Sequence, residues 1–236
     1  IGNSITRQYF REVEQQLKGK AFVGQLSTSK SLGDPGLLKE VELVMGYHRF
    51  DVVHFNNGMH GWDYSEEEYA RAFPGLLRVI RKCAPGAKLI WASTTPVRTG
   101  QDMKDFAERN SRVIGRNRLA AEILKNEDVL INDLYSVMER DPVFYQGGDG
   151  VHPAPAGVKA LATQVSSKIR QALGTELFFA RRHIVNGDKL SVILPGEILS
   201  FRRQVNPLFL REPLLDFLFY FFLQRLKVIL DDCPNH

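Results

Sequence analysis

Helical and extended patterns alternate along the chain from residue 4 to about residue 174. Apolar residues that recur every three or four positions predict helices at 5–17, 35–47, 65–83, 103–125 and 156–173. Short apolar runs between them predict strands at 21–23, 51–55, 88–92 and 129–131. This alternation is typical of an α/β fold with a mainly parallel sheet.

Helices that join successive parallel strands lie on both faces of the sheet, because the crossovers are right-handed. We therefore expect a three-layer sandwich whose functional site lies at the carboxyl ends of the strands. One element is missing from this arrangement. A first strand should lead into Gly2, Asn3 and Ser4, yet only Ile1 precedes them. We expect the sequence to be truncated at its N-terminus.

The character of the chain changes after Gly174. Residues 175–236 contain a basic pair, Arg181 and Arg182, and an apolar block at 214–230. The longest uncharged run in that block, 217–223, is far shorter than the roughly 18 residues that a membrane span needs. We predict a domain at 1–174 and a C-terminal extension of unassigned fold at 175–236. A core or docking helix is favoured for the block; an interfacial membrane helix and a tail foreign to the domain are the alternatives.

Composition narrows the function classes. The chain has 236 residues, of which 44% are hydrophobic and 25% charged, as in ordinary globular proteins. The net charge of +4 comes from basic residues scattered among acidic ones, so a nucleic-acid partner is not expected. Cys83 and Cys233 lie far apart and indicate neither a zinc site nor a disulfide framework. Nothing in the sequence indicates a metal or organic cofactor, a cellular location or an oligomeric state.

Ser4 is the first candidate for chemistry. It lies between the presumed end of a strand and the helix that follows, so its hydroxyl should face the mouth of the sheet. Its own amide would be at a helix N-terminus, where developing negative charge is stabilised. A plain helix-capping serine has the same local pattern. Ser4 alone is therefore a weak signal.

A second segment, Gly148-Asp149-Gly150-Val151-His152-Pro153, strengthens the interpretation of Ser4 as a nucleophile. An aspartate three residues before a histidine, in a loop that precedes a helix, can orient the imidazole while the other ring nitrogen faces a hydroxyl. His152 would then take the proton of Ser4, and Asp149 would stabilise the imidazolium. Separately, the two residues could be a helix cap and a surface histidine. Together with Ser4 they form a nucleophile, a base and an orienting carboxylate.

Polar and glycine-rich segments follow two further predicted elements. Asn56 and Asn57 come directly after the strand at 51–55, where a side-chain amide can donate to an oxyanion. Gly33 precedes a predicted helix and could add a backbone donor in the same region. We also expect side chains near the site to contact substrate, namely Asn56, His60, Trp62 and Arg98. A simple Asn-Gly turn and loop packing are the alternatives.

These blocks resemble those of the SGNH (GDSL-like) hydrolase superfamily over residues 1–173. Gly2-Asn3-Ser4-Ile5 is similar to the Gly-Asp-Ser block of that family, with Asn3 in place of the usual aspartate, and residues 149–153 match its Asp-x-x-His block. Gly33 is our choice for the glycine block. Asn56-Asn57-Gly58 replaces the usual Gly-x-Asn-Asp, and we favour Asn57 over Asn56 as the donor. The resemblance implies a flavodoxin-like sandwich that hydrolyses acyl esters through an acyl-enzyme without a cofactor.

Three functions remain open from the sequence. The first is an esterase that removes a small acyl group, such as acetyl, from a hydroxylated or carbohydrate substrate, with Ser4, Gly33 and Asn57 forming the oxyanion hole. The second is a lipid esterase or thioesterase in which the block at 214–230 contacts a membrane. The third is a non-catalytic binding module on a degenerate hydrolase scaffold, because the first and third blocks depart from the family pattern.

Overall fold

The computed structural model describes residues 1–174 together with 184–186, 189–194 and 197–202. The chain divides into two compact units, Ile1–Phe179 and Ala180–His236. In the second unit, β6 (Ile184–Asn186), β7 (Lys189–Leu194) and β8 (Glu197–Arg202) form an antiparallel sheet in that order. The apolar block at 214–230 lies outside the described residues.

A parallel sheet forms the centre of the first unit. Its strands are ordered β1 (Val52–Phe55), β2 (Lys88–Ala92) and β5 (Val129–Asn132), with Val53 opposite Leu89 and Leu89 opposite Val129. Alternate residues of β2 face opposite sides, and nearly all of them are buried. Strands that are covered on both faces read as continuous apolar runs, which is why β2 was evident in the sequence.

The first two residues extend this sheet. The Ile1 ammonium donates to the His54 carbonyl at 2.8 Å, and the Asn56 amide donates to the Ile1 carbonyl at 3.1 Å. On the other side, Gly2 N–H donates to Leu26 O and Thr28 N–H to Gly2 O, both at 2.9 Å. Residues 1–2 therefore run between β1 and residues 26–28, parallel to both, and Ser4 follows at the carboxyl edge of the sheet.

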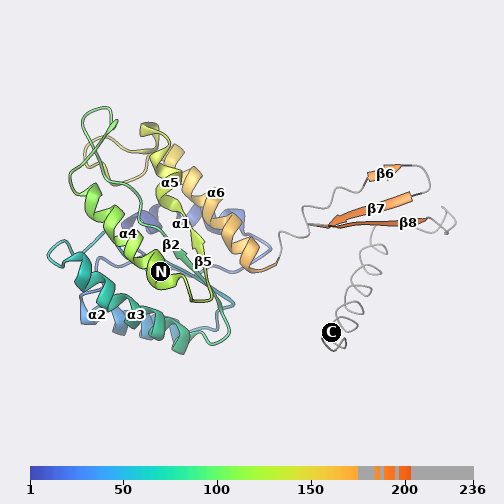
Figure 1. The fold of residues 1–236 in the computed structure, drawn as a ribbon, viewed down its shortest axis with the longest axis horizontal. Helices are drawn as coiled ribbons and strands as arrows, with labels where there is room; N and C mark the ends of the chain where they lie inside the picture. Colours follow the sequence, from blue (N-terminus) through green and yellow to red (C-terminus); the bar gives the residue numbers. More distant parts are fainter. Residues whose placement is uncertain (175–183, 187–188, 195–196, 203–236) are drawn as a thin grey trace. The chain divides into compact units, whose positions relative to one another are not determined.

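Helices cover both faces of the sheet, in the three layers expected (Figure 1). One apolar core joins α1 (Ser4–Gln16), α5 (Leu134–Glu139) and α6 (Pro155–Ala172) to Ile90 and Ala92 of β2. The other joins α2 (Pro35–Met45), α3 (Glu66–Cys83) and α4 (Asn110–Leu124) to Leu89 and Trp91. The alternation of side chains along one strand thus divides the two cores.

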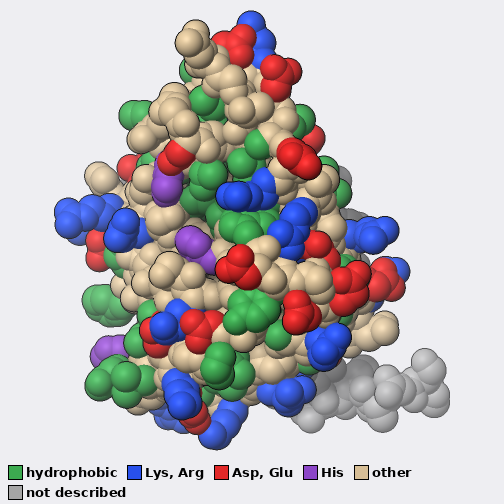
Figure 2. Space-filling view, turned by 90° about the vertical axis from the view of Figure 1, so that its left-hand side faces the viewer, with side chains coloured by type: hydrophobic (Ala, Val, Ile, Leu, Met, Phe, Trp, Pro, Cys, Tyr) green, Lys and Arg blue, Asp and Glu red, His purple; other side chains and the backbone are tan. Residues whose placement is uncertain are grey.

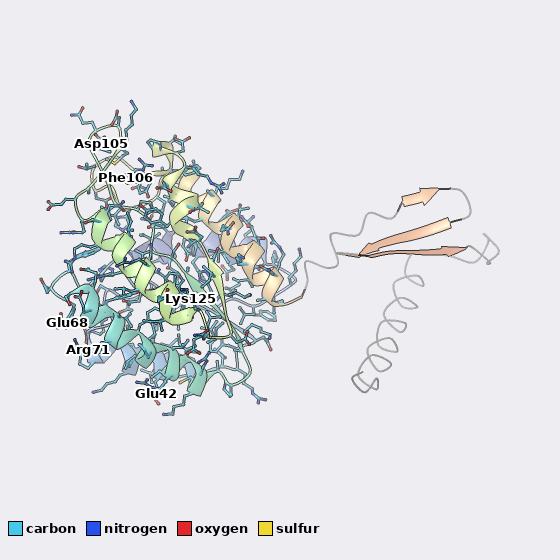
Figure 3. The ribbon with its side chains drawn as sticks, in the orientation of Figure 1. Glu42, Glu68, Arg71, Asp105, Phe106 and Lys125 are labelled. Carbon is cyan, nitrogen blue, oxygen red and sulfur yellow. The ribbon has the colours of Figure 1, made fainter. Side chains whose placement is uncertain are left out.

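Helix starts follow the local sequence. The Asn3 side chain caps α1, Asp34 caps α2 ahead of Pro35, and Ser65 forms a reciprocal capping box with Glu68 at the start of α3. Glu68 is labelled in Figure 3. Such caps each stabilise a helix by about 1 kcal/mol, because they satisfy amides that have no partner inside the helix.

Two predicted elements differ from the structure. Residues 21–23 form no strand; the ladder with Gly2 lies at Ser27 instead. The helix predicted at 103–125 begins only at Asn110, because β3 (Arg98–Thr99) and β4 (Asp105–Phe106) form a short antiparallel pair before it. Asp105 and Phe106 are labelled in Figure 3. Within the first unit, the apolar pattern also missed α5 and the short 3-10 helix η1 (Pro142–Phe144).

A cavity of about 640 Å³ lies beside Ile1. It is lined by residues 20–26, by β1 and by apolar side chains of α1 and α6, and neither Ser4 nor His152 lines it. The cavity is thus separate from the carboxyl edge of the sheet that carries Ser4.

Candidate active site

Ser4 is the first residue of α1. Asn3 precedes it in an extended conformation, and its side-chain oxygen accepts from the amides of Ile5 and Thr6 at 3.0 and 3.4 Å. The amide of Ser4 is the N–H ahead of these two. A Cβ atom at Gly2 would lie 2.0 Å from the Thr6 hydroxyl oxygen, so only glycine lets the strand pass this close to the helix. The turn therefore presents the Ser4 hydroxyl at a helix N-terminus.

Residues 148–153, which we term the histidine loop, meet Ser4 from the far end of the domain. His152 Nε2 lies 2.9 Å from Ser4 Oγ, and His152 Nδ1 contacts Asp149 Oδ2. The other Asp149 oxygen accepts from the amides of Val151 and His152 at 2.8 and 3.0 Å. The structure therefore brings the three predicted catalytic side chains into one chain of hydrogen bonds, in which a proton on Nδ1 leaves Nε2 free to accept from Ser4.

Gly150 shapes this loop. Its φ of +65° lies in the left-handed region, and an added Cβ would lie 1.8 Å from the Arg98 carbonyl oxygen. A side chain at this position is therefore excluded both by backbone strain and by space. The close approach lets the Arg98 amide donate to the Gly150 carbonyl at 2.8 Å, which anchors the loop two residues before His152.

The charge on Asp149 is stabilised by its hydrogen bonds. Burial alone would raise the pKa of this carboxyl group, but bonds from the His152 side chain and from the two backbone amides lower it. His60 also has a lowered pKa, first because of burial and second because of the charge of His152. The two histidines therefore interact electrostatically.

Residues 56–64, which we term the asparagine loop, carry the predicted amide donors. The Asn57 side-chain oxygen accepts from Leu32 N–H at 3.1 Å, and its Nδ2 donates to Lys30 O at 2.9 Å. Asn57 therefore ties this loop to residues 30–33, which include Gly33, and its second amide hydrogen is not used by that bond. The ring of Tyr64 lies 2.6 Å from where a Cβ of Gly33 would be, so the backbone packs closely there.

Asn56 has a structural environment, which corrects our expectation of substrate contact. The residue is 8% exposed. Its Nδ2 donates to Ala92 O at 2.7 Å and to Thr94 Oγ1 at 3.2 Å, across the sheet to the end of β2. Both amide hydrogens are thus occupied by the scaffold. The structure separates the two neighbouring asparagines, and only Asn57 keeps a hydrogen to donate.

Arg98 also departs from the substrate-binding role that we expected. It is 5% exposed, and its guanidinium donates to the carbonyls of Met103, Lys104 and Glu139 at 2.6–3.0 Å. The same guanidinium lies 4.6 Å from the ring centre of Phe106. Both terminal nitrogens of the guanidinium bond to backbone carbonyls of the scaffold, and those of Met103 and Lys104 lie in the β3–β4 turn. This turn and β4 stand where the start of a helix was predicted.

Two arginines that the sequence reasoning missed hold the asparagine loop. Arg116 of α4 is 1% exposed in its side chain and donates to the carbonyls of Gly58, His60, Gly61 and Tyr64 at 2.7–3.1 Å. Arg112 donates to Trp62 O and Tyr64 O, and both arginines contact Glu66. A signal was present: Arg116 occupies the apolar stripe of Val113, Ala120 and Leu124, where a charge needs buried partners.

The remaining predicted contacts are His60 and Trp62, which both lie on the loop held by these arginines. Trp62 packs against the core of α1 and α6 and is partly exposed, as is His60. Within the described residues, no cluster of three or more His, Cys, Asp or Glu side chains could hold a metal ion. No helix in the part of the chain that the structure describes is long and apolar enough to cross a membrane.

Comparisons with known proteins agree on the architecture. A carbohydrate esterase family 3 protein from Talaromyces cellulolyticus aligns with a TM-score of 0.61, at 17% identity over 74% of this chain and 96% of that one. This chain has an SGNH hydrolase fold. A carbohydrate acetylesterase family member from Sinorhizobium meliloti aligns at 0.58, with 17% identity over 74% of this chain and 97% of the other. A GDSL-like lipase from Bacteroides thetaiotaomicron aligns at 0.55, with 16% identity over 72% and 86%.

Comparisons by sequence gave no match. No family model matches this chain, and no curated protein matches it. The SGNH likeness therefore rests on the three-dimensional arrangement of the strands and helices.

Proposed function

We propose that this protein is a serine carboxylic-ester hydrolase that acts through an acyl-enzyme. The observation that carries the proposal is the hydrogen-bonded chain from Asp149 through His152 to Ser4, with 2.9 Å between His152 Nε2 and Ser4 Oγ. Nucleophile, base and orienting group are within direct reach of one another, as this chemistry requires. The SGNH fold, shared with esterases and lipases, supports the same reaction class.

In the first step His152 Nε2 accepts the hydroxyl proton as Ser4 Oγ bonds to the acyl carbon of the ester. Negative charge moves to the former carbonyl oxygen. The proposed donors to it are the amides of Ser4 and Gly33 and the free amide hydrogen of Asn57. The imidazolium, stabilised by the ionised Asp149, then protonates the leaving alcohol as the carbon–oxygen bond breaks. Water, activated by the neutral His152, cleaves the acyl-enzyme by the same steps.

For the substrate we propose a small acyl group, such as acetyl, on a hydroxylated or carbohydrate alcohol. This proposal is supported by the polar His60 and aromatic Trp62 on the asparagine loop, since the charge of His152 contributes to the lowered pKa of His60. Two of the proteins with this fold are named as carbohydrate esterases or acetylesterases. A lipid ester is the second candidate, because GDSL-like lipases share the fold.

The test is hydrolysis of p-nitrophenyl acetate by this chain beside its Ser4→Ala and His152→Ala variants, followed by an acyl-length series. We expect activity that both substitutions remove and that declines as the acyl chain lengthens. Turnover of long-chain esters alone would favour the lipid substrate. A folded parent no more active than its variants would contradict the catalytic proposal and favour a binding module.

A further inference from the structure

Trp62, on the asparagine loop, lies among three guanidinium groups. The guanidinium carbons of Arg109, Arg112 and Arg116 lie 5.0, 5.4 and 4.5 Å from its ring centre. Arg112 and Arg116 donate to loop carbonyls and to Glu66. Arg109 differs from them. It is exposed, and the indole is the single side-chain partner that the described residues give it.

The charges around Trp62 do not balance. Glu66 is the carboxylate paired with Arg112 and Arg116, so one negative charge faces two positive ones before Arg109 is counted. Asp63 and Glu108 are the acidic neighbours in sequence. Both are exposed, and within the described residues neither forms an ion pair with Arg109. An excess of positive charge therefore surrounds a partly buried indole. Within the described residues, Arg109 is the one of the three arginines whose side chain donates no hydrogen bond.

Two connections lead from this cluster toward the histidine loop. On one side, His60 is two residues before Trp62, and burial and then the charge of His152 lower the pKa of His60. On the other, Ala107 N–H donates to Val97 O at 2.9 Å and the Asn110 side chain accepts from Val97 N–H at 3.0 Å. The next residue, Arg98, donates to Gly150 of the histidine loop. Both elements that carry the cluster are thus tied to the surroundings of His152.

Figure 2 shows one face of the molecule, on which hydrophobic side chains lie in the middle with Lys and Arg side chains around them and His side chains nearby. A guanidinium held beside an indole is less free to turn than one in water, so fewer of its orientations are lost when it binds a planar anion.

We propose that Arg109, supported by Trp62, is a subsite for a carboxylate group of the ester substrate. The guanidinium fork matches a carboxylate in two parallel hydrogen bonds, and the ester bond would then lie over Ser4. The inference rests on the proposed function and narrows its substrate class to acyl esters of acidic sugars. Arg109 determines specificity in this scheme and takes no part in the chemical step.

The experiment compares an acetyl ester of glucuronic acid with the same acetyl ester of glucose. In the parent we expect a preference for the acidic ester in kcat/KM that weakens as salt is added, because the charges are exposed. Arg109→Ala should lower the ratio of acidic to neutral kcat/KM about tenfold, mainly through KM, and Arg109→Lys should restore part of it, since lysine keeps the charge without the fork.

Arg118→Ala is the matched control, because Arg118 is an exposed arginine of α4, the helix that Arg109 precedes, and is not among the arginines at the Trp62 ring. It should leave the ratio unchanged. The subsite proposal would be overturned if Arg109→Ala lowered kcat/KM equally for both esters. It would also be overturned if Arg118→Ala lowered the ratio of acidic to neutral kcat/KM as much as Arg109→Ala does.

A second measurement separates this inference from the proposed function. Binding of methyl glucuronide and of methyl glucoside to the Ser4→Ala variant is followed by NMR titration, which requires no turnover. Selective binding of the glucuronide that is lost in Ser4→Ala/Arg109→Ala supports the subsite even if the parent hydrolyses no ester. Equal binding of the two sugars contradicts it, whatever the activity of the parent.

Discussion

The histidine loop and the asparagine loop flank the same serine but are held in different ways. In residues 148–153 the important bonds are local, since Asp149 bonds to Val151 and His152 within three residues. In residues 56–64 they are distant, since Arg116 reaches carbonyls 52–58 positions away in sequence. The first loop orients the proposed catalytic histidine with its own bonds, whereas the second depends on α4 for its shape.

This difference indicates whether substitutions in each loop should affect activity or stability. Changes in the histidine loop act on chemistry, because Asp149 is half exposed and supports no core packing. Changes beneath the asparagine loop act first on folding, because Arg116 is buried and its carbonyl partners would lose their donors. The four predictions below test this division, from the largest effect to the smallest.

Asp149→Asn should lower kcat about ten-thousandfold, because the amide no longer selects the tautomer that leaves His152 Nε2 free to accept from Ser4. Thermal stability should change little. The measurement is steady-state p-nitrophenyl acetate hydrolysis, with Asp128→Asn as the control, since Asp128 is exposed and outside the loop. A loss below tenfold would show that His152 is oriented by other groups.

Arg116→Met should lower the free energy of unfolding by about 3–5 kcal/mol, because it leaves buried carbonyls and half of the Glu66 ion pairs without a partner. Urea denaturation of both proteins measures it. Arg118→Met on the exposed side of α4 is the control and should cost under about 1 kcal/mol. Similar midpoints for the two variants would contradict the idea that the asparagine loop depends on α4.

Asn57→Ala should lower kcat about a hundredfold to a thousandfold, the usual cost of one oxyanion donor. Asn56→Ala should instead lower stability with a smaller change in kcat of the folded enzyme, because its amide hydrogens bond to Ala92 and Thr94. Measuring kcat and unfolding for both variants separates the two neighbours. If Asn56→Ala has the larger effect on kcat, our choice of donor is reversed.

The fourth prediction concerns His54 of β1, which should make the free energy of unfolding depend on pH. Burial, with a contribution from the N-terminal ammonium, lowers its pKa to about 3, and Asn132 donates to its neutral ring at 3.1 Å. The unfolded chain, with a pKa near 6.5, binds a proton that the folded one does not. Stability from this group is therefore complete above about pH 6.5 and is lost as pH falls toward 3, by at most about 1.4 kcal/mol per pH unit.

The measurement is urea denaturation at several pH values between 6.5 and 4, for the parent and His54→Gln. The variant should show the shallower slope, since glutamine does not titrate. Parallel slopes in the two proteins would mean that His54 ionises as readily in the folded chain as in the unfolded one.

Local patterns in the chain were sufficient for several features of the molecule. The continuous apolar run of β2 and the spacing in α3 predicted these elements, and the three-layer α/β architecture followed from their alternation. Ser4 at a strand end and Asp149 three residues before His152 predicted a hydrogen-bonded set, because each geometry involves only a few neighbouring residues. The cap at Ser65 was evident for the same reason.

Folding in three dimensions decided the roles of the long polar side chains. Asn56 and Asn57 are identical in type and adjacent, yet one bonds across the sheet and the other to residues 30–32. Arg98 was expected at the substrate and instead binds three carbonyls, while Arg116 was not singled out at all. A buried donor must be hydrogen-bonded, and its partner is a carbonyl that the packing brings near it. Because packing joins segments that lie far apart in the chain, that partner cannot be identified from the local sequence.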